Sequence, residues 1–202
     1  MNGLIRCDWG SLDDPLYRDY HDREWGVPVH DDKRIFEYLI LEGFQAGLSW
    51  STVLKKRENF RKAFDGFDPE AVAGYDSKKI KDILSDPGLI RNRLKVESAV
   101  NNAKAFLRVQ KEFGSFDKYI WGFVDYKPII NKWRSAKEIP STSSVSDRLS
   151  RDLVLRGFRF VGSTICYAHM QATGMVNDHV MSCFRYTEII NSLDPRDTVA
   201  GR

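Results

Sequence analysis

Two cysteines and two histidines form a candidate metal site. Cys7 and His21 flank WGSLDDPLY, a segment with turn signals, and His179 and Cys183 lie four residues apart in VNDHVMSC. If the second segment is a helix, its two side chains leave the same face. Two imidazoles and two thiolates complete a tetrahedral Zn²⁺ site with no position open to a substrate, so the expected role is structural. The alternative is four separate residues, since free cysteines are often simply buried.

A second candidate site surrounds Glu42 in the segment LEGFQAGLSW. At about 100° of rotation per helical residue, Glu42 falls in the middle of an apolar stripe. An unpaired buried carboxylate is costly, so this acid needs a partner. With Trp50 close behind it, the pattern favours a pocket for a flat ligand with polar edges, whereas a Glu paired with an Arg or capping a helix is the alternative. More aromatic surface lies in the N-terminal arm, at Trp9, Tyr20 and Trp25.

The segment ILSDPGLIRNRLKVESAVNNA has the pattern helix, tight glycine turn, helix. Backbone N–H groups at Gly88 and Ile90, and at the start of the second helix, are placed to bind a phosphate without reading sequence. Arg91, Arg93 and Lys95 add positive charge beside them, and nine Lys or Arg face three Asp or Glu between positions 78 and 111. This pattern favours DNA binding. An ordinary helical hairpin with a solvated charged face is the alternative.

The residues that follow Glu42 are expected to form an exposed loop. Gln45, Gly47 and Leu48 place one amide and one apolar side chain there. Such a wedge can fill the gap left by a nucleotide that has turned out of the duplex, as apolar side chains do in kinked DNA. The alternative for Leu48 is ordinary core packing.

Length and composition favour one globular domain, or two small helical lobes around a shared core. The chain has 202 residues, of which 42% are hydrophobic and 29% charged, and its net charge of +3 is too small to indicate nucleic acid by itself. Three cysteines make no even set for a disulfide framework, which favours a reducing cytoplasm. No apolar run is long enough to cross a bilayer, so no membrane partner is expected.

Periodicity predicts an all-α protein. One compact domain is expected over residues 1–186, and a flexible tail over 187–202. Extended chain is expected only at 128–130 or 159–161. Helices are predicted at about 31–44, 52–65, 69–74, 77–84, 91–112, 115–121, 145–156, 162–173 and 177–186.

Three long motifs, in this order, resemble the bacterial 3-methyladenine DNA glycosylase I family: YHDREWGVP, LEGFQAGLSWSTVLKKRENFRKAF and RGFRFVGSTICYAHMQATGMVNDH. The likeness runs from about Cys7 to Tyr186. It implies an all-α helix–hairpin–helix DNA glycosylase fold, with the hairpin at about 78–112. It also implies one structural Zn²⁺ that staples the N- and C-terminal regions through Cys7, His21, His179 and Cys183. The implied activity is excision of 3-methyladenine from alkylated double-stranded DNA by a cytoplasmic, monomeric, monofunctional enzyme that releases the free base.

The resemblance also implies roles in the pocket. Glu42 and Tyr20 would hydrogen-bond the flipped base and Trp50 would stack on it, while Trp9 and Trp25 match aromatic positions nearby. Related helix–hairpin–helix glycosylases place an aspartate after the hairpin. This chain has none there before Asp117, so water attack would rely on positioning and electrostatics. Whether Glu42, the candidate catalytic residue, acts in chemistry or only in binding stays open.

Two other functions are compatible with the same residues. One is a non-catalytic DNA-binding module that uses the metal and the hairpin only for architecture. The other is a glycosylase for a different lesion, such as an oxidised or 7-methylated purine. A buried Glu42 beside Trp50 argues against the first, because phosphate binding needs no such pocket.

Overall fold

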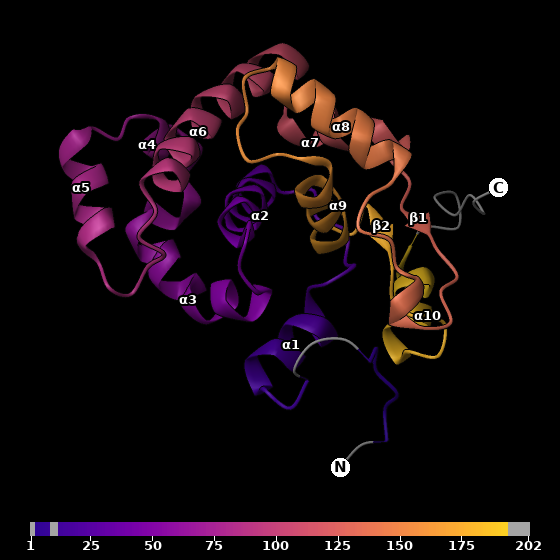
Figure 1. Ribbon diagram of the computed structural model, residues 1–202. Coiled ribbons are helices and arrows are strands. Elements are labelled where there is room, and N and C mark those ends of the chain that lie inside the picture. The colour runs from indigo at the N-terminus through magenta and orange to yellow at the C-terminus, as the bar shows by residue number, and fades with distance from the viewer. Residues whose placement is uncertain (1–2, 9–11, 194–202) are drawn as a thin grey trace.

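The computed structural model describes residues 3–8 and 12–193, and these residues are mostly helical (Figure 1). This confirms the all-α prediction. Two two-residue strands pair in parallel, with Ile129 opposite Val176. No described helix is long and apolar enough to cross a membrane. In chain order the elements are α1 Pro15–Arg23, α2 Asp32–Gln45, α3 Trp50–Ala63, η1 Asp65–Phe67, α4 Pro69–Ala73, α5 Ser77–Ser85, α6 Arg93–Phe113, α7 Phe116–Trp121, η2 Gly122–Val124, β1 Ile129–Ile130, η3 Ala136–Glu138, α8 Ser144–Leu155, α9 Ser163–Ala172, β2 Val176–Asn177 and α10 Phe184–Ser192.

Short polar side chains set where the helices begin. Asp31 accepts a hydrogen bond from the backbone N–H of Arg34 at the start of α2, and Asn92 does the same for Lys95 at the start of α6. Such caps satisfy N–H groups that have no partner within the helix. The cap of α5 is Asp76, so the helix begins at residue 77, as predicted.

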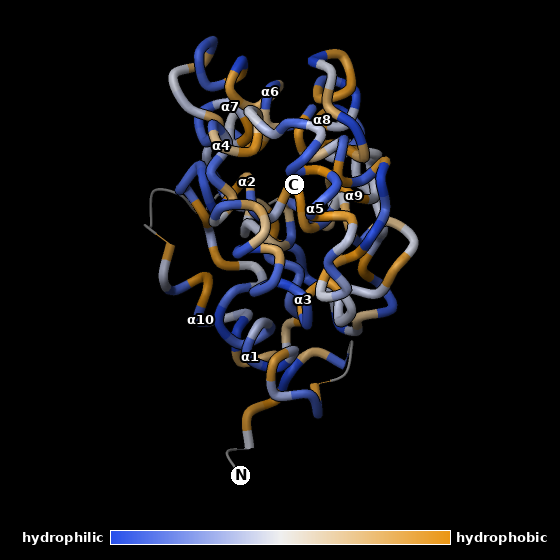
Figure 2. The backbone as a smooth tube through the Cα atoms, turned by 90° about the vertical axis from the view of Figure 1, so that its left-hand side faces the viewer, coloured by the Kyte–Doolittle hydropathy of each residue, from blue (hydrophilic) through white to orange (hydrophobic). Residues whose placement is uncertain are grey.

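Helix α2 lies at the centre of the fold and packs against α3, α6, α7 and α9. Because it has neighbours on several sides, most of its length is buried, including Phe36, Leu41 and Phe44. The other long helices have one buried face, and Figure 2 shows apolar and polar stretches alternating along them. This arrangement places the C-terminal half of α2, which carries Glu42, inside the molecule.

The N-terminal arm lies beside the start of α10 and the end of α9. The backbone N–H of Phe184 donates to the carbonyl of Ile5 at 2.9 Å, and Gly26, just after α1, donates to Gln171 at the end of α9, also at 2.9 Å. Gly174 has a φ of +70°, and a Cβ there would lie 2.3 Å from the backbone carbon of Val27. Glycine is therefore required where these backbones meet.

The helix predicted over 177–186 was wrong. Strand β2 is followed by a turn in which the side chain of Asn177 accepts from the N–H of His179, a local bond that competes with helix formation. Helix α10 starts only at Phe184. It continues to Ser192 and buries Ile189, so the flexible tail predicted from 187 began too early. Residues 194–202 lie outside the described residues.

Of the two segments expected to be extended, one forms a strand. Strand β1 falls within 128–130, whereas residues 159–161 form a bend and a connecting loop. The first turn of α6 also differs from the prediction. The hydropathy of Leu94 predicts a position on the apolar face of the helix 91–112, but its side chain is 66% exposed.

Candidate active site and metal centre

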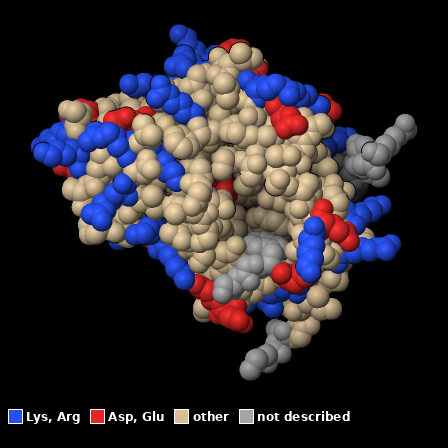
Figure 3. All heavy atoms as spheres, viewed as in Figure 1, with Lys and Arg blue, Asp and Glu red and all other residues tan. Residues whose placement is uncertain are grey.

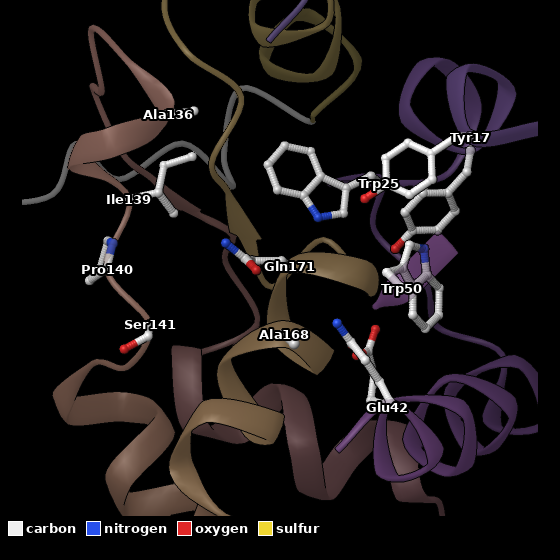
Figure 4. A pocket seen from close by; sticks show the side chains of 12 residues that line it. Tyr17, Trp25, Glu42, Trp50, Ala136, Ile139, Pro140, Ser141, Ala168 and Gln171 are labelled. Carbon is white, nitrogen blue, oxygen red and sulfur yellow. The ribbon is translucent and has the colours of Figure 1, made fainter. Parts of the chain in front are cut away.

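A cavity of about 380 Å³ opens between the N-terminal helices and α9. In Figure 3 it is the hollow near the middle of the face, and acidic atoms are visible within it. Its walls come from α1 to α3, from α9 and from the segment 136–141 (Figure 4). The lining residues are Tyr17, Tyr20, Trp25, Glu42, Gln45, Trp50, Ala136, Ile139, Pro140, Ser141, Ala168 and Gln171.

Glu42 is buried in the floor of this cavity, as the helical periodicity predicted. Only 2% of its surface is exposed, and its Oε2 has no hydrogen-bond partner among the described residues. Burial raises the pKa of Glu42 to about 8, since a charged carboxylate loses hydration that the protein does not replace. The carboxyl of Glu42 therefore keeps its proton to a higher pH than an exposed glutamate does.

Two aromatic residues pack together beside Glu42. The rings of Tyr20 and Trp50 have centroids 5.2 Å apart and are inclined at 48°. Nε1 of Trp50 is buried and has no hydrogen-bond partner among the described residues. Burial, and then the nearby Glu42, raise the pKa of Tyr20 well above its usual range, so its hydroxyl stays protonated. The pocket thus combines aromatic surface with three protonated or protonatable polar groups.

Sequence reasoning identified part of this pocket. Trp25 lines it as expected, whereas Trp9 lies outside the described residues. Tyr17 and Gln171 were missed. Tyr17 lies three residues before Tyr20 and so shares its helical face, a signal that could have found it. Gln171 lies inside the third long motif but has no periodicity of its own to mark it.

The four predicted metal ligands converge. Their ligand atoms all lie within 4.8 Å of one another, and all four side chains are buried. Nδ1 of His179 lies 3.4 Å from Sγ of Cys7 and 3.5 Å from Sγ of Cys183, and Nε2 of His21 lies 3.7 Å from the latter. Ligands of a tetrahedral Zn²⁺ at its usual Zn–S and Zn–N lengths are separated by about 3.6 Å. The donor set and its spacing therefore fit this ion.

Further contacts orient both imidazoles of the cluster. Nδ1 of His21 lies 2.8 Å from Asp22, which Arg6 in turn holds by an ion pair. Nε2 of His179 donates to the carbonyl of Trp25 at 3.0 Å. Each imidazole thus has one nitrogen bound to the protein and the other directed into the cluster, the arrangement usual for histidine metal ligands. The Cys7 thiol and both imidazoles lower the pKa of the Cys183 thiol well below its usual range.

The cluster adjoins the pocket. His21 follows Tyr20 on α1, and the ring of Trp25 lies edge-on to that of His179, with centroids 4.6 Å apart. Fixing the cluster therefore fixes two walls of the cavity, Tyr20 and Trp25.

The turn between α5 and α6 is held by α3. The N–H of Gly88 donates to the side chain of Asp86 at 2.7 Å, so it is already used within the turn. The carbonyl of Gly88 accepts from Lys56 and Asn59. A Cβ at Gly88 would lie 2.8 Å from Nδ2 of Asn59. Glycine at this position thus permits close packing between the turn and α3.

The predicted DNA contacts fall into two groups. Arg91 and Arg93 are exposed, and Ile90 is half-buried. Lys95 differs, because it is buried and its Nζ donates to the carbonyls of Phe44 and Ala46 at the end of α2. The expected phosphate contact of Lys95 is therefore not supported, since its ammonium caps a helix instead.

The predicted wedge has one residue inside the pocket and one outside. Gln45 is half-buried and lines the cavity, whereas Leu48 is 42% exposed. Gly47, between them, has a φ of +77°, a conformation that favours glycine.

Comparisons with known proteins agree with this geometry. A family model described as methyladenine glycosylase matches residues 9–186. The chain is 49% identical, over 183 residues, to DNA-3-methyladenine glycosylase 1 of Escherichia coli (strain K12), across 91% of this chain and 97% of that relative. A crystal structure of 3-methyladenine DNA glycosylase I (TAG) superposes with a TM-score of 0.86 at 49% identity, covering 89% of this chain and 98% of the other. A single-residue variant of such an enzyme, in complex with 3-methyladenine, gives 0.85 at 33% identity, covering 97% and 99%.

Proposed function

The chain belongs to the methyladenine glycosylase family, and we propose that it hydrolyses the N-glycosidic bond of 3-methyladenine in alkylated DNA as a base-excision repair enzyme. One observation carries this proposal most directly. A buried aromatic pocket contains a carboxyl oxygen of Glu42 and the indole nitrogen of Trp50, neither of which has a partner within the described protein. Buried polar atoms are nearly always hydrogen-bonded, so this pair fits a polar ligand that arrives from outside.

The ligand is a base turned out of the double helix. Flipping costs a few kcal/mol, and less for a damaged nucleotide. Adenine methylated at N3 is cationic, and a cation over an indole face gains about 0.5–2 kcal/mol. Trp50 would stack on it. Burial favours the protonated form of Glu42, and Glu42 can lose this proton to solvent when the cation enters, because an opposite charge nearby favours the carboxylate.

The positive charge of the base also drives the reaction. When the bond between C1′ of the sugar and N9 breaks, its electron pair moves to the base and neutralises it, leaving an oxocarbenium ion on the sugar. Water then adds to C1′ and loses a proton. With so good a leaving group, positioning and electrostatic stabilisation supply the catalysis. Glu97 on α6 forms a surface ion pair with Arg93, so it offers no catalytic acid after the hairpin.

We infer that double-stranded DNA lies over the face shown in Figure 3, where Lys and Arg gather over α5 and the adjoining part of α6. The helix–hairpin–helix role of residues 78–112 remains part of this proposal. Arg91 and Arg93 are the exposed charges beside the turn, and Leu48 is the apolar side chain that would fill the gap left by the flipped base. A monomeric enzyme in the cytoplasm is the expected form.

We also propose that the cluster of Cys7, His21, His179 and Cys183 holds one structural Zn²⁺. The ion would supply the cross-link between the N-terminal arm and the segment before α10. All four ligands come from the protein, so no position would remain for water or substrate. These residues therefore act on the reaction only by positioning Tyr20 and Trp25.

Chromatography of the free bases released from methylated double-stranded DNA tests the function. Release of 3-methyladenine, with little 7-methylguanine, is expected. Glu42→Gln should lower its release roughly tenfold or more, because a charge-assisted hydrogen bond is lost. Glu70→Gln, at an exposed carboxyl on α4, is the matched control and should not change it.

Three outcomes would overturn the proposal or part of it. Release of an oxidised or 7-methylated purine instead would assign another lesion. DNA binding without release of any base would leave a non-catalytic binding module. Equal release by the wild type and the Glu42→Gln variant would remove the role given to Glu42.

A further inference from the structure

Gln171, at the end of α9, has a side-chain amide whose orientation is fixed by its neighbours. Nε2 donates to Oδ2 of Asp178 at 2.8 Å. A carboxylate accepts hydrogen bonds and does not donate them, so the amide nitrogen, not the oxygen, must face Asp178. Oε1 therefore faces the other way. No hydrogen bond to Oε1 is formed by the residues that the structure describes, although Gln171 lines the cavity.

Asp178 is itself immobilised. It is completely buried. One carboxylate oxygen accepts from Asn131 and from the indole of Trp133, each at 2.7 Å. The other accepts from Gln171 and, at 2.7 Å, from the hydroxyl of Tyr167. Four donors thus hold a carboxylate that would be costly to bury alone. A reversal of the Gln171 amide would set two acceptors against each other.

Gln171 and Glu42 project into the cavity from different helices. In Figure 4, Gln171 extends from α9 and Glu42 from α2, with Trp50 on the side of Glu42. The backbone carbonyl of Gln171 is also fixed, because Gly26 donates to it at 2.9 Å. A flat base stacked on Trp50 would therefore meet a hydrogen-bonding group from each of two helices.

These two groups differ in how they can adapt to a ligand. Glu42 can accept a hydrogen bond, and as the protonated acid it can also donate one. Gln171 presents only an acceptor, since its donor side is committed to Asp178. Glu42 can thus satisfy a base edge of either polarity, whereas Gln171 can satisfy only a donor.

We propose that Gln171 is a specificity-determining residue that selects adenine over guanine, and that Asp178 is the positioning residue that holds its amide. This proposal rests on the proposed glycosylase function. The exocyclic amino group of 3-methyladenine donates to Oε1 of Gln171. 3-Methylguanine carries a carbonyl oxygen at the same ring position, which would face Oε1 as a second acceptor. The site therefore rejects methylated guanine through polarity rather than size.

The test is the ratio of catalytic efficiencies, kcat/KM, for release of 3-methyladenine and of 3-methylguanine from methylated DNA. Gln171→Met removes the acceptor at similar side-chain length. We expect it to lower the release of 3-methyladenine without an equal loss for 3-methylguanine, so that the ratio falls roughly tenfold. If both rates fall together, Gln171 has only a structural role and the inference is wrong.

Asp178→Asn provides an independent variant. Its amide can donate to Oε1 of Gln171, which permits the Gln171 side chain to reverse and present its NH₂ to the pocket. The ratio should again fall, through a gain in 3-methylguanine release. Thermal unfolding and metal content show whether the variant has kept its fold.

Failure of this inference and failure of the proposed function give different results. A wild-type protein that releases neither base overturns both. A wild type that releases 3-methyladenine, with an unchanged ratio in both variants, overturns the role of Gln171 alone. Affinities of the free bases, measured by quenching of tryptophan fluorescence, should show the same change in preference as the ratio.

Discussion

The base pocket and the Cys/His cluster adjoin each other, but they differ in whether their buried polar atoms have partners within the protein. In the pocket, Oε2 of Glu42 and Nε1 of Trp50 have no partner among the described residues. In the cluster, the imidazoles of His21 and His179 each have one nitrogen bound by the protein and the other directed at the thiols. A group left unsatisfied is available to an external ligand, and a group held on both sides is part of the framework.

The two regions are also expected to have opposite effects on the stability of the folded protein. Glu42 is a buried acid without a partner, and such a group destabilises the fold at any pH where its unfolded form would ionise. With the proposed Zn²⁺ bound, the cluster would act in the other direction, because binding of a metal ion to a site absent from the unfolded chain contributes to folding. We therefore expect changes in the two regions to move stability in opposite directions.

The largest effect should come from breaking the cluster. Cys183→Ser removes one proposed Zn²⁺ ligand, and the free energy of unfolding should fall by on the order of 5 kcal/mol or more. Urea unfolding and elemental analysis measure stability and zinc content. Cys166→Ser is the matched control, since Cys166 is equally buried but lies outside the cluster. Full stability in Cys183→Ser, with no bound metal in the wild type, would contradict the proposed site.

The next effect is a pH-dependent gain in stability when Glu42 is replaced. Its pKa is about 8 in the folded protein and near 4.3 in an unfolded chain, so the folded state binds the proton more tightly. Wild-type stability should therefore fall as pH rises from about 4 to 8, and then level off. Glu42→Gln lacks this loss and should gain up to about 4 kcal/mol, relative to the wild type, between pH 5 and 8.

Urea unfolding at several pH values checks this prediction. The exposed Glu70→Gln variant provides the baseline. A difference between Glu42→Gln and the wild type that is constant across pH would show that the carboxyl does not carry the expected shift.

A smaller effect is expected from Trp50, and it should be confined to the pocket. Trp50→Ala removes the proposed stacking surface, which is worth about 1–3 kcal/mol per base, so 3-methyladenine release should fall by roughly 5- to 150-fold. Trp50→Phe retains a ring and should fall less. Zinc content should not change in either variant. Loss of metal from Trp50→Ala would show that the two regions are less independent than their contacts indicate.

The smallest effect concerns the outer surface, away from both regions. Arg91→Gln removes an exposed charge beside the turn before α6. It should weaken DNA binding a few-fold at moderate salt, and reduce the salt dependence of log Kd by about one phosphate contact. Lys111→Gln, at the far end of the same 21-residue helix, is about 30 Å away and serves as the control. Equal losses in both variants would contradict a DNA surface localised at the turn.

The sequence was sufficient to predict features that depend on residue type or on helical periodicity. The four residues of the Cys/His cluster were selected from their chemistry and do converge, although the helix expected to carry His179 and Cys183 does not exist. Their convergence depends on the turn after Asn177, which no periodicity signals. Glu42 was placed correctly because a 14-residue helix gives enough turns to define its apolar stripe.

Features that depend on distant partners were missed. At the start of α6, Leu94 is exposed and Lys95 buried, the reverse of what their hydropathy suggests. The reason is that the end of α2, about 50 residues earlier in the chain, offers two carbonyls that a lysine can cap. The orientations of Gln171 and Asp178 likewise depend on hydrogen-bond donors from other segments of the chain. Polar residues that are buried by tertiary contacts leave little local pattern to read.

Two contacts join parts of the chain that are synthesised at different times. Phe184 donates a hydrogen bond to Ile5, and Cys7 lies beside a histidine that follows 172 residues later. A ribosome releases the N-terminal end of a chain first. Tyr20 and Trp25 therefore emerge well before the segment around His179 and Phe184 that anchors them. The central helices can pack around α2 before that point. The wall of the pocket is then completed only after Phe184 has been synthesised, so a chain that stops before this segment has no assembled site.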